Sequence, residues 1–271
     1  MAPFLCRFLS ALSLFTGLVL AAPALAIDLL EQPAVQSDAA ARTLLLDITR
    51  KSDGSLAAVG TFGVVVISTD DGATWNQASV PASVALTAVH FPSPESGWAV
   101  GHDGLILHSS DGGQSWRKQL DGYALNDQVI EVAERIVAQV RSEFEALQSD
   151  EDADEYDIED AEFALEEAEF MLEGAMDDAE AGPVRPLLDV WFRNGTEGYV
   201  AGSYGMLLHT TDAGASWTLV SDRMDNPEAF HLNQIQPAPD GTLFIAGESG
   251  FVFRSSDGGM TWDSLEPGYP G

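Results

Sequence analysis

The chain has few basic residues and only one cysteine. Its 271 residues include 12 Lys and Arg against 43 Asp and Glu, a formal net charge of −31. Nucleic acids and anionic membrane surfaces are bound through basic residues that meet phosphate, so this composition argues against both as partners. The single cysteine is Cys6, close to the N-terminus. The rest of the chain can therefore form no disulfide, reactive thiol or thiolate metal site.

Long apolar runs are also absent, except at the N-terminus. Arg7 precedes an apolar stretch from Phe8 to Ala22, which is followed by Ala24-Leu25-Ala26. This pattern predicts a signal peptide over residues 1–26, cut after Ala26, and hence a periplasmic or secreted protein. A membrane anchor is the competing interpretation, but the stretch is short and ends in small residues. Cys6 precedes the apolar stretch instead of lying at the cleavage site, which argues against a lipoprotein.

A motif of the form [ST]-x-D-x-G-x-[ST]-W occurs four times. An eight-residue pattern with five fixed positions could occur once by chance, but not four times in one chain. Repetition at about 40 residues is typical of a solenoid or a propeller. We expect the fixed positions to be structural, namely Ser68, Asp70, Gly72, Thr74, Trp75, Ser109, Asp111, Gly113, Ser115, Trp116, Thr210, Asp212, Gly214, Ser216, Trp217, Ser255, Asp257, Gly259, Thr261 and Trp262.

Each copy has the chemistry of a tight turn between two strands. The Asp can accept hydrogen bonds from backbone N–H groups, and Gly can adopt a positive φ. The Trp buries a large surface, and we expect it to pack into its own blade. Four carboxylates awaiting a metal or a substrate are the functional alternative, but four identical joints suit a repeat better than four identical sites.

Strand-like runs surround each motif. In the second copy they are Leu86 to Phe91, Gly97 to Gly101 and Leu105 to Ser109, rich in β-branched and aromatic residues and bounded by turn residues. Three strands before the motif and one after it predict a four-stranded antiparallel propeller blade.

The motif is the Asp-box, or BNR repeat, of sialidases and other propeller proteins. The longer phrase LTAVHFPSPESGWAVGHDGLILHSSDGGQSW resembles the photosystem II stability/assembly factor family and its bacterial periplasmic relatives. The resemblance covers residues 42–122 and 184–265. It implies a propeller that acts as an assembly factor, and it implies more blades than four. We therefore expect an open or incomplete arc, shorter than usual for the family, with exposed edges.

The pattern changes completely between Leu120 and Pro183. Val129, Ala133, Ile136, Val140, Phe144 and Leu147 step by threes and fours, as do Ile158, Ala161, Leu165, Ala168, Leu172 and Ala175. This spacing predicts two amphipathic helices joined by an acidic turn, with an N-cap at Asn126 or Asp127. The predicted fold is thus all-β, with four Asp-box blades and an inserted acidic α-helical hairpin. The divisions are the signal peptide, a lead-in segment at 27–41, blades one and two at 42–122, the hairpin at 123–183, and blades three and four at 184–271.

The insertion carries much of the acidity. Between Asp127 and Glu180 lie 21 acidic residues against only Arg135 and Arg141. Such a surface is either a solvated face that maintains solubility or a docking arm for a basic partner surface. The run Asp150-x-Asp152-x-Asp154 suggests a calcium loop, but Glu155 and Ala161 occupy the positions that require Gly and Glu. We therefore predict no metal.

Catalytic signatures are missing from the sequence. It contains no Ser-His-Asp, P-loop, zinc or Rossmann motif, and its arginines do not match the sialidase context. His108 and His209 hold equivalent repeat positions, which favours a structural role. We predict no catalytic residue and no cofactor, although a carboxylate pair of the glycosidase type stays open as an alternative.

Partner contact is expected on one face of the blades. The Asp-box turns share a face with the turns between first and second strands. The opposite face carries the turns between second and third strands, the connections between blades and the helical hairpin. Residues that vary at equivalent turn positions are free for recognition. The candidates are His102, Asp103, Tyr204, Asp225, Asn226, His231 and Glu248.

Two classes of function remain. The first is a non-catalytic exported propeller that serves as an assembly, stability or scaffold factor for a membrane-associated complex. That complex would be a photosystem in a phototroph and an envelope or transport system otherwise. The alternative is a secreted glycan-binding protein or a sialidase-like glycoside hydrolase.

Overall fold

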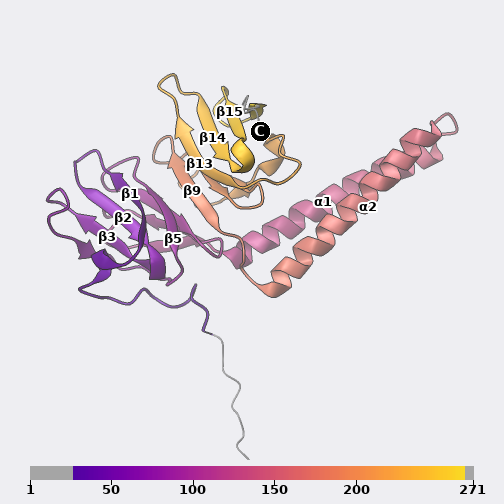
Figure 1. The fold of residues 1–271 in the computed structure, drawn as a ribbon. Coiled ribbons are helices and arrows are strands. Elements are labelled where there is room, and N and C mark those ends of the chain that lie inside the picture. Colours follow the sequence, from indigo (N-terminus) through magenta and orange to yellow (C-terminus); the bar gives the residue numbers. More distant parts are fainter. Residues whose placement is uncertain (1–26, 266–271) are drawn as a thin grey trace, which may run out of the picture.

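The computed structural model describes residues 27–265, and the predicted signal peptide lies outside them. The described chain forms four separate four-stranded antiparallel sheets and a long helical hairpin (Figure 1). In each sheet the strands follow one another in chain order. The sheets stand side by side as blades, and the arc that they make is not closed. The predicted fold class is thereby confirmed.

The strands of the first two blades are β1 (Leu45–Arg50), β2 (Leu56–Gly60), β3 (Val65–Ser68), β4 (Asn76–Gln77), β5 (Leu86–His90), β6 (Gly97–Gly101), β7 (Ile106–Ser109) and β8 (Arg117–Leu120). Those of the last two are β9 (Leu187–Phe192), β10 (Gly198–Gly202), β11 (Leu207–Thr210), β12 (Thr218–Leu219), β13 (Leu232–Pro237), β14 (Leu243–Gly247), β15 (Val252–Ser255) and β16 (Asp263–Leu265). Short 3-10 turns occur at η1 (Ala40–Arg42), η2 (Thr61–Gly63), η3 (Ser221–Arg223) and η4 (Glu248–Gly250). The first strand of every blade lines a shared central cavity of about 370 Å³.

The second and third strands of each blade are joined by the same tight turn, here called the 2–3 turn. Its two central residues both have positive φ: Phe62 and Gly63, Asp103 and Gly104, Tyr204 and Gly205, Ser249 and Gly250. In all four turns the residue after Gly donates its N–H to the carbonyl three positions before it. Two left-handed residues define a type I′ turn, whose twist suits the flanking strands. Gly fills the second position without steric cost, and the first position varies.

The four Asp-box turns have one hydrogen-bond scheme. The leading hydroxyl donates to Asp Oδ1 at 2.8 Å in every copy and accepts from the N–H of the fixed Gly. The hydroxyl of the second Ser or Thr donates to Asp Oδ2 at 2.6 or 2.7 Å, and the backbone N–H of the same residue donates to Asp Oδ1. Each carboxylate is thus fully engaged within its own turn.

These bonds favour the charged carboxylate. Hydroxyl and backbone donors from Thr74 lower the pKa of Asp70 to about 2, and those from Ser216 do the same for Asp212. At Asp111 partial burial raises the pKa, but the bonds from Ser115 and Ser109 outweigh it and bring the value to about 2. The pKa of Asp257 is lowered in the same way, with the Thr261 hydroxyl as the largest cause.

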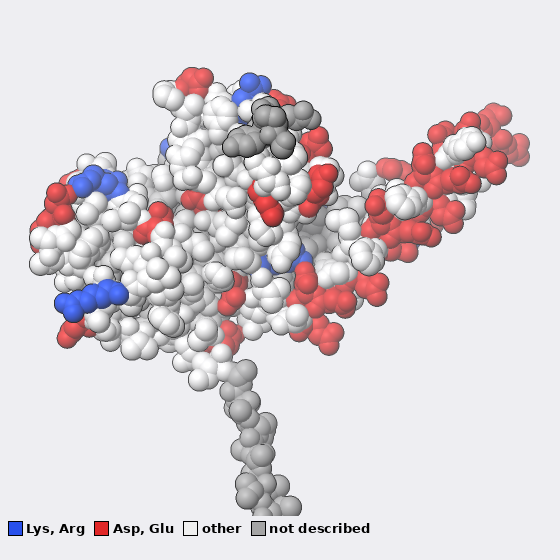
Figure 2. All heavy atoms as spheres, viewed as in Figure 1, with Lys and Arg blue, Asp and Glu red and all other residues white. Residues whose placement is uncertain are grey.

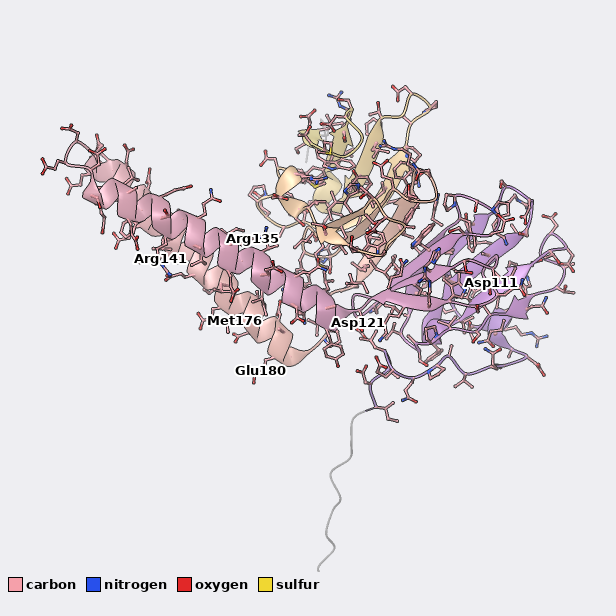
Figure 3. The ribbon with its side chains drawn as sticks, turned by 180° about the vertical axis from the view of Figure 1, so that it is seen from behind. Asp111, Asp121, Arg135, Arg141, Met176 and Glu180 are labelled. Carbon is pink, nitrogen blue, oxygen red and sulfur yellow. The ribbon has the colours of Figure 1, made fainter. Side chains whose placement is uncertain are left out.

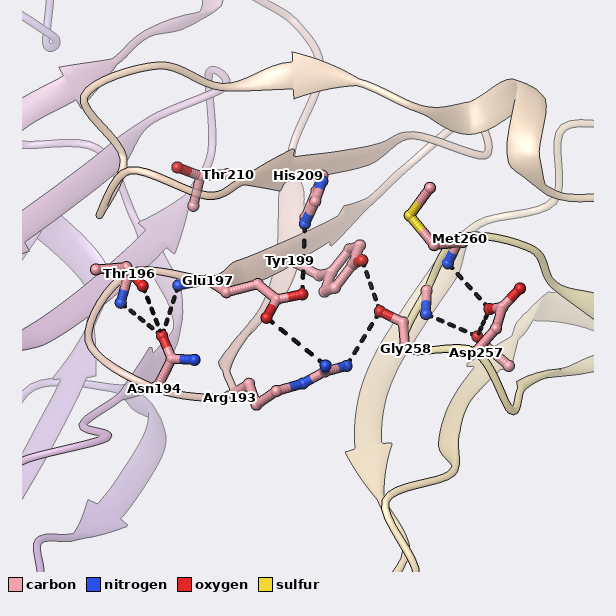
Figure 4. A network of polar contacts seen from close by, with 12 residues as sticks. Arg193, Asn194, Thr196, Glu197, Tyr199, His209, Thr210, Asp257, Gly258 and Met260 are labelled. Carbon is pink, nitrogen blue, oxygen red and sulfur yellow. Dashed lines mark hydrogen bonds and ion pairs between the residues drawn. The ribbon is translucent and has the colours of Figure 1, made fainter.

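Each Asp-box turn after the first is attached to the preceding blade. The residue before the fixed Gly presents its carbonyl to a donor of that blade. Lys51 Nζ donates to Gly112 O at 3.0 Å, and Gln119 Nε2 donates to Ala213 O at 2.8 Å. Tyr199 Oη and Arg193 both donate to Gly258 O (Figure 4). The Asp-box turn is therefore a joint between blades as well as within one.

The Asp-box tryptophans do not pack only into their own blades, so that expectation is wrong. Trp116 lies in a core cluster with Val65 and Ile67 of blade one, and Trp217 in one with Trp98 of blade two. Trp262 packs edge-on against Tyr199 of blade three, with ring centroids 6.3 Å apart. The reason is geometric: a blade is one sheet thick, so a side chain leaving its face meets the neighbouring sheet.

The two ends of the arc differ from its middle. Trp75 has no blade before it within the described chain, and it packs partly buried near Ala40 of the lead-in segment. On blade four, Phe244 and Val252 occupy the positions that Trp98 and Ile106 fill in blade two, where both are buried. Phe244 is only half-buried, because no fifth blade covers it among residues 27–265. The described arc is open on this face.

The helical hairpin consists of α1 (Gly122–Ser149) and α2 (Glu155–Ala181). The expected N-cap at Asn126 or Asp127 is wrong. Asp121, five residues before Asn126, caps α1 by accepting the Ala124 N–H, and Asn126 is buried within the helix. Its side chain instead donates to Gly182 O at 3.1 Å, which ties the two ends of the hairpin together.

The root of α1 belongs to the propeller core. Leu125 is fully buried in the cluster between blades two and three, and Val129 packs against it. Beyond this point the hairpin projects away from the blades (Figures 1 and 3). Neither long helix of the described chain has a stretch apolar enough to cross a membrane. In the tip, Asp150 ends α1 and Asp154 caps α2 by accepting the Tyr156 N–H.

Replacing Trp116 by Ala should destabilise the protein by about 3–5 kcal/mol, because a large aromatic side chain is lost from an interface between blades. Trp75→Ala is the matched control. It removes the same residue from the same turn, but on a face without a preceding blade, and should cost less. Chemical denaturation measures both. Equal losses would contradict the assignment of the Trp to the interface between blades.

Asp111→Asn should be less stable than the wild type above pH 4. The folded-state pKa of Asp111 is about 2 and the usual value is 3.8, so its contribution is fully present above the unfolded pKa. The contribution disappears as the pH falls from about 4 to about 2. The difference in Tm between wild type and variant should therefore shrink over that range. A difference that stays constant down to pH 2 would contradict the hydrogen-bond scheme.

Candidate functional site

The candidate site lies where the helical hairpin meets the 2–3 turns. The N–H of Gly122, at the start of α1, donates to Asp103 O of the blade-two turn. On the return side, Gly104 N–H donates to Arg185 O, just after α2. Both ends of the hairpin are therefore fixed to one turn of blade two. The hairpin and the 2–3 turns share this face of the molecule.

A row of side chains runs from the hairpin across blades three and four. Asp178 of α2 forms an ion pair with Arg185, whose side chain is only 13% exposed. The Arg185 guanidinium carbon lies 5.6 Å from the centroid of the Tyr204 ring. Tyr204 packs edge-on against His231, with ring centroids 5.2 Å apart. His231 in turn lies beside Glu248, with 3.8 Å from Nδ1 to Oε2. We call these five residues the turn row.

Backbone contacts hold the aromatic part of the turn row in place. His231 Nδ1 accepts the N–H of Tyr204 at 3.0 Å. The N–H of His231 donates to Glu248 Oε2, and the N–H of Glu248 donates to His231 O. The bond from Tyr204 crosses from the blade-three turn to the residue before the first strand of blade four, and the two bonds between His231 and Glu248 lie within blade four. The row therefore presents a preformed surface of aromatic and charged groups.

Tyr204 sits in a left-handed conformation with its ring half-exposed. Its φ is 55° and its exposed fraction is 54%; Phe62, in the equivalent turn of blade one, has φ 62° and is 69% exposed. For a residue with a Cβ, this conformation costs roughly 1 kcal/mol. Asn, Asp or Gly would fit the turn better. An exposed aromatic ring at a strained position is a candidate for contact with another molecule, and of these two rings only Tyr204 belongs to the turn row.

Three of the seven predicted residues are brought together: Tyr204, His231 and Glu248. Asn226 lies nearby, but its side chain stabilises its own loop. Its Nδ2 donates to Phe230 O and its Oδ1 accepts the Phe230 N–H. Asp225 is exposed at the start of that loop. These last two residues are therefore placed beside the turn row without joining it.

His102 and Asp103 lie on the other side of the hairpin root. His102 is exposed and is held by its backbone N–H, which donates to Ala85 O. Burial raises the pKa of Asp103, and the nearby Asp28 adds to that increase. Asp28 also accepts a hydrogen bond from Tyr123 Oη at 3.0 Å. This second group connects the lead-in segment to α1, and it is separate from the turn row.

Sequence reasoning missed Arg185 and Asp178, which link the hairpin to the blades. No repeat position singles them out, since they belong to the boundary of the insertion. Phe62 is not among the residues predicted from the sequence. Its signal was an aromatic residue directly before the Gly of a type I′ turn, a pattern that it shares with Tyr204.

Two titratable side chains with shifted pKa values line the central cavity, Asp189 and His90. Burial raises the pKa of Asp189 to about 6 and lowers the pKa of His90. Asp47 Oδ2 accepts the N–H of Val89, and Asp189 Oδ2 accepts the N–H of Ile235. Each carboxylate thus binds the first strand of the next blade. Residues 27–265 contain no group of three or more His, Cys, Asp or Glu arranged to hold a metal ion.

The chain is similar to known proteins over its blades. Photosystem II assembly lipoprotein Ycf48 of Synechococcus sp. (strain CC9902) is 36% identical over 89 residues, which cover 31% of this chain and 26% of that protein. A solved structure titled YCF48 bound to D1 peptide shares 15% identity over 81% of this chain and 53% of that one, with a TM-score of 0.46. The chain thus spans about a quarter of the curated relative and about half of this structure.

An ancestral GH74 enzyme also has a similar structure. It shares 12% identity over 82% of this chain and 25% of that one, with a TM-score of 0.48. The family model described as photosynthesis system II assembly factor YCF48 matches residues 31–132 and 179–271. The match includes all four blades and leaves out residues 133–178, the outer part of the helical hairpin. The resemblance expected from the Asp-box phrases is confirmed: the chain belongs to the photosynthesis system II assembly factor YCF48 family.

Proposed function

We propose that this protein is a non-catalytic assembly or stability factor that binds a protein component of a membrane-associated complex. In a phototroph the complex is photosystem II, as membership of the YCF48 family suggests. Elsewhere it is an envelope or transport system. The protein is exported through the predicted signal peptide and acts in the periplasm or outside the cell.

The turn row is the observation that carries this proposal. It places an exposed tyrosine, a histidine and carboxylates on one preformed surface at the base of the acidic hairpin. Tyr is enriched where proteins bind proteins, because its ring offers apolar area and its hydroxyl a hydrogen bond. The row also spans two blades and the hairpin root, so a partner bound there contacts three parts of the chain at once.

A catalytic role is less well supported. The central carboxylates Asp47 and Asp189 each accept a backbone N–H of the following blade, and the Asp-box carboxylates are engaged within their turns. A glycosidase needs a pair of carboxyl groups that are free to face the substrate. The arrangement of these six acidic residues suits joints of the propeller better than an acid and base pair.

The acidic hairpin supports a partner with a basic surface. Its outer helices are covered by acidic side chains (Figure 2), and the electrostatic field of such an arm favours encounter with positively charged proteins. Its ion pairs are few, among them Arg141 with Glu169 and Arg185 with Asp178. Most of its carboxylates are therefore free to act on a partner.

Tyr204→Ala should weaken capture of the membrane partner by about tenfold, as expected for an aromatic residue central to an interface. Purified mature protein is immobilised and used to capture proteins from detergent-solubilised membranes of the source organism. Mass spectrometry identifies and quantifies what is retained. Phe62→Ala is the matched control, since it removes an even more exposed aromatic ring from the equivalent turn of blade one.

The two variants distinguish specific binding by the turn row from nonspecific adsorption through exposed aromatic rings. Equal retention by wild type and Tyr204→Ala would place the interface elsewhere, as would an equal loss for Phe62→Ala. Replacement of residues 93–96, on the Asp-box face, should leave capture unchanged. Loss of capture in that variant alone would show that the opposite face binds the partner.

A further inference from the structure

The sequence of α2 repeats every seven residues between Tyr156 and Met176. Three heptads follow one another, YDIEDAE, FALEEAE and FMLEGAM. Their third positions are Ile158, Leu165 and Leu172, and their sixth positions are Ala161, Ala168 and Ala175. These alternate by threes and fours, as the a and d positions of a coiled coil do.

The a and d positions explain how α2 packs on α1. Ala168 and Ala175 are buried, and Ile158, Leu165 and Leu172 are partly buried. Small residues at d allow the two helices to approach closely. The seam therefore accounts for six of the apolar positions in the three heptads, and the hairpin needs no others to hold its helices together.

The first position of each heptad is aromatic and has no role in this seam. Tyr156, Phe163 and Phe170 fall at the f position, which points away from the partner helix. Their exposed fractions are 76%, 61% and 75%. The corresponding positions of α1 are Arg135, Ser142 and Ser149, all exposed and polar. Single exposed apolar residues are common, but three at a regular interval along one helix face form a candidate binding surface. We call the three residues the aromatic ladder.

Acidic residues border the ladder on both sides. Glu159 and Asp160 lie one turn after Tyr156, and Glu166 and Glu167 lie between Phe163 and Phe170. In a helix, residues three and four apart are neighbours, so each gap of the ladder contains a pair of carboxylates. All four are exposed. The surface is thus an apolar stripe with negative edges.

We propose that the aromatic ladder binds a basic amphipathic α-helix of a partner protein. Seven residues rise by about 10.5 Å along a helix, so the ladder offers contacts at the same interval as one apolar stripe of a second helix. Lysine or arginine beside that stripe would meet the paired carboxylates. The ladder lies within residues 133–178, outside the family match, and so belongs to this chain's own addition.

Charge favours a basic helix over a second copy of the chain or an anionic membrane as the partner of the ladder. A second copy of the chain would bring an equally acidic surface against the ladder, and an anionic membrane would be repelled in the same way. An extended peptide would not keep the interval of seven residues. The inference rests on the proposed protein-binding function and specifies the partner's chemistry at the hairpin.

The test uses the mature protein and a fluorescein-labelled synthetic helix of about three heptads, with Leu at a and d and Lys at e and g. Binding is followed by fluorescence anisotropy. The triple variant Tyr156→Ala, Phe163→Ala, Phe170→Ala should bind this peptide about tenfold more weakly or worse. The control variant Met171→Ala, Met176→Ala removes exposed apolar side chains from the same helix outside the ladder and should change affinity less than about twofold. Circular dichroism verifies that both variants stay helical.

Several outcomes would overturn the proposal. They are no binding by the wild type, equal binding by the ladder variant, and equal binding of a matched peptide with Glu in place of Lys. Binding to phosphatidylglycerol vesicles that is lost in the ladder variant would assign the ladder to a membrane, and ladder-dependent dimerisation would assign it to a second copy. If the peptide fails while Tyr204 still governs capture from membranes, the ladder is excluded and the proposed function stands.

Discussion

The structure depends on the contact between each Asp-box turn and the preceding blade. In blades two, three and four, one turn carbonyl accepts a side-chain hydrogen bond from the neighbouring sheet, and the following Trp enters the core between the two sheets. A four-stranded blade has little core of its own, because each sheet is a single layer. Burial between blades therefore supplies most of the apolar contact. The same contact also orients each blade relative to the previous one.

The helical hairpin relies on this arrangement for its position. Leu125 and Val129 of α1 belong to the cluster that contains Trp98 and Trp217, so the root of the hairpin is part of the interface between blades two and three. Arg185, just beyond α2, carries the connection to Tyr204. A rigid base and a projecting acidic arm are thus built from one core. Because the base and the arm are joined, the proposed turn row and aromatic ladder can contact the same partner at two places, one at the blades and one along the hairpin.

Much of the fold follows from the sequence, because the Asp-box motif, the strand runs and the helical periodicity are all local patterns. Contacts between repeats are not local, and for this reason the placement of each Trp against the preceding blade could not be predicted. The N-cap at Asp121 was missed because helix α1 begins inside the blade boundary, ahead of the visible apolar periodicity.

The candidate site was also only partly predictable from the sequence. The 2–3 turns were recognised as variable, but the blade geometry joins Tyr204 to His231 and Glu248 and leaves His102 and Asp103 beside Tyr123 and Asp28. The seven-residue repeat of α2 is also visible in the sequence. Only the structure shows that α1 packs on the opposite side of α2, so that the aromatic positions take no part in the contact between the two helices.

A double-mutant cycle across the interface between blades two and three tests the account most directly. Trp98 of β6 stacks on Phe192 of β9 with ring centroids 3.6 Å apart, whereas Phe253 of blade four belongs to another cluster. Unfolding free energies of Trp98→Leu, Phe192→Leu and their double variant should show a coupling of about 1 kcal/mol or more, while Trp98→Leu with Phe253→Leu should be additive within about 0.5 kcal/mol. Additive losses for Trp98 and Phe192 would contradict the conclusion that contacts between blades hold the arc together.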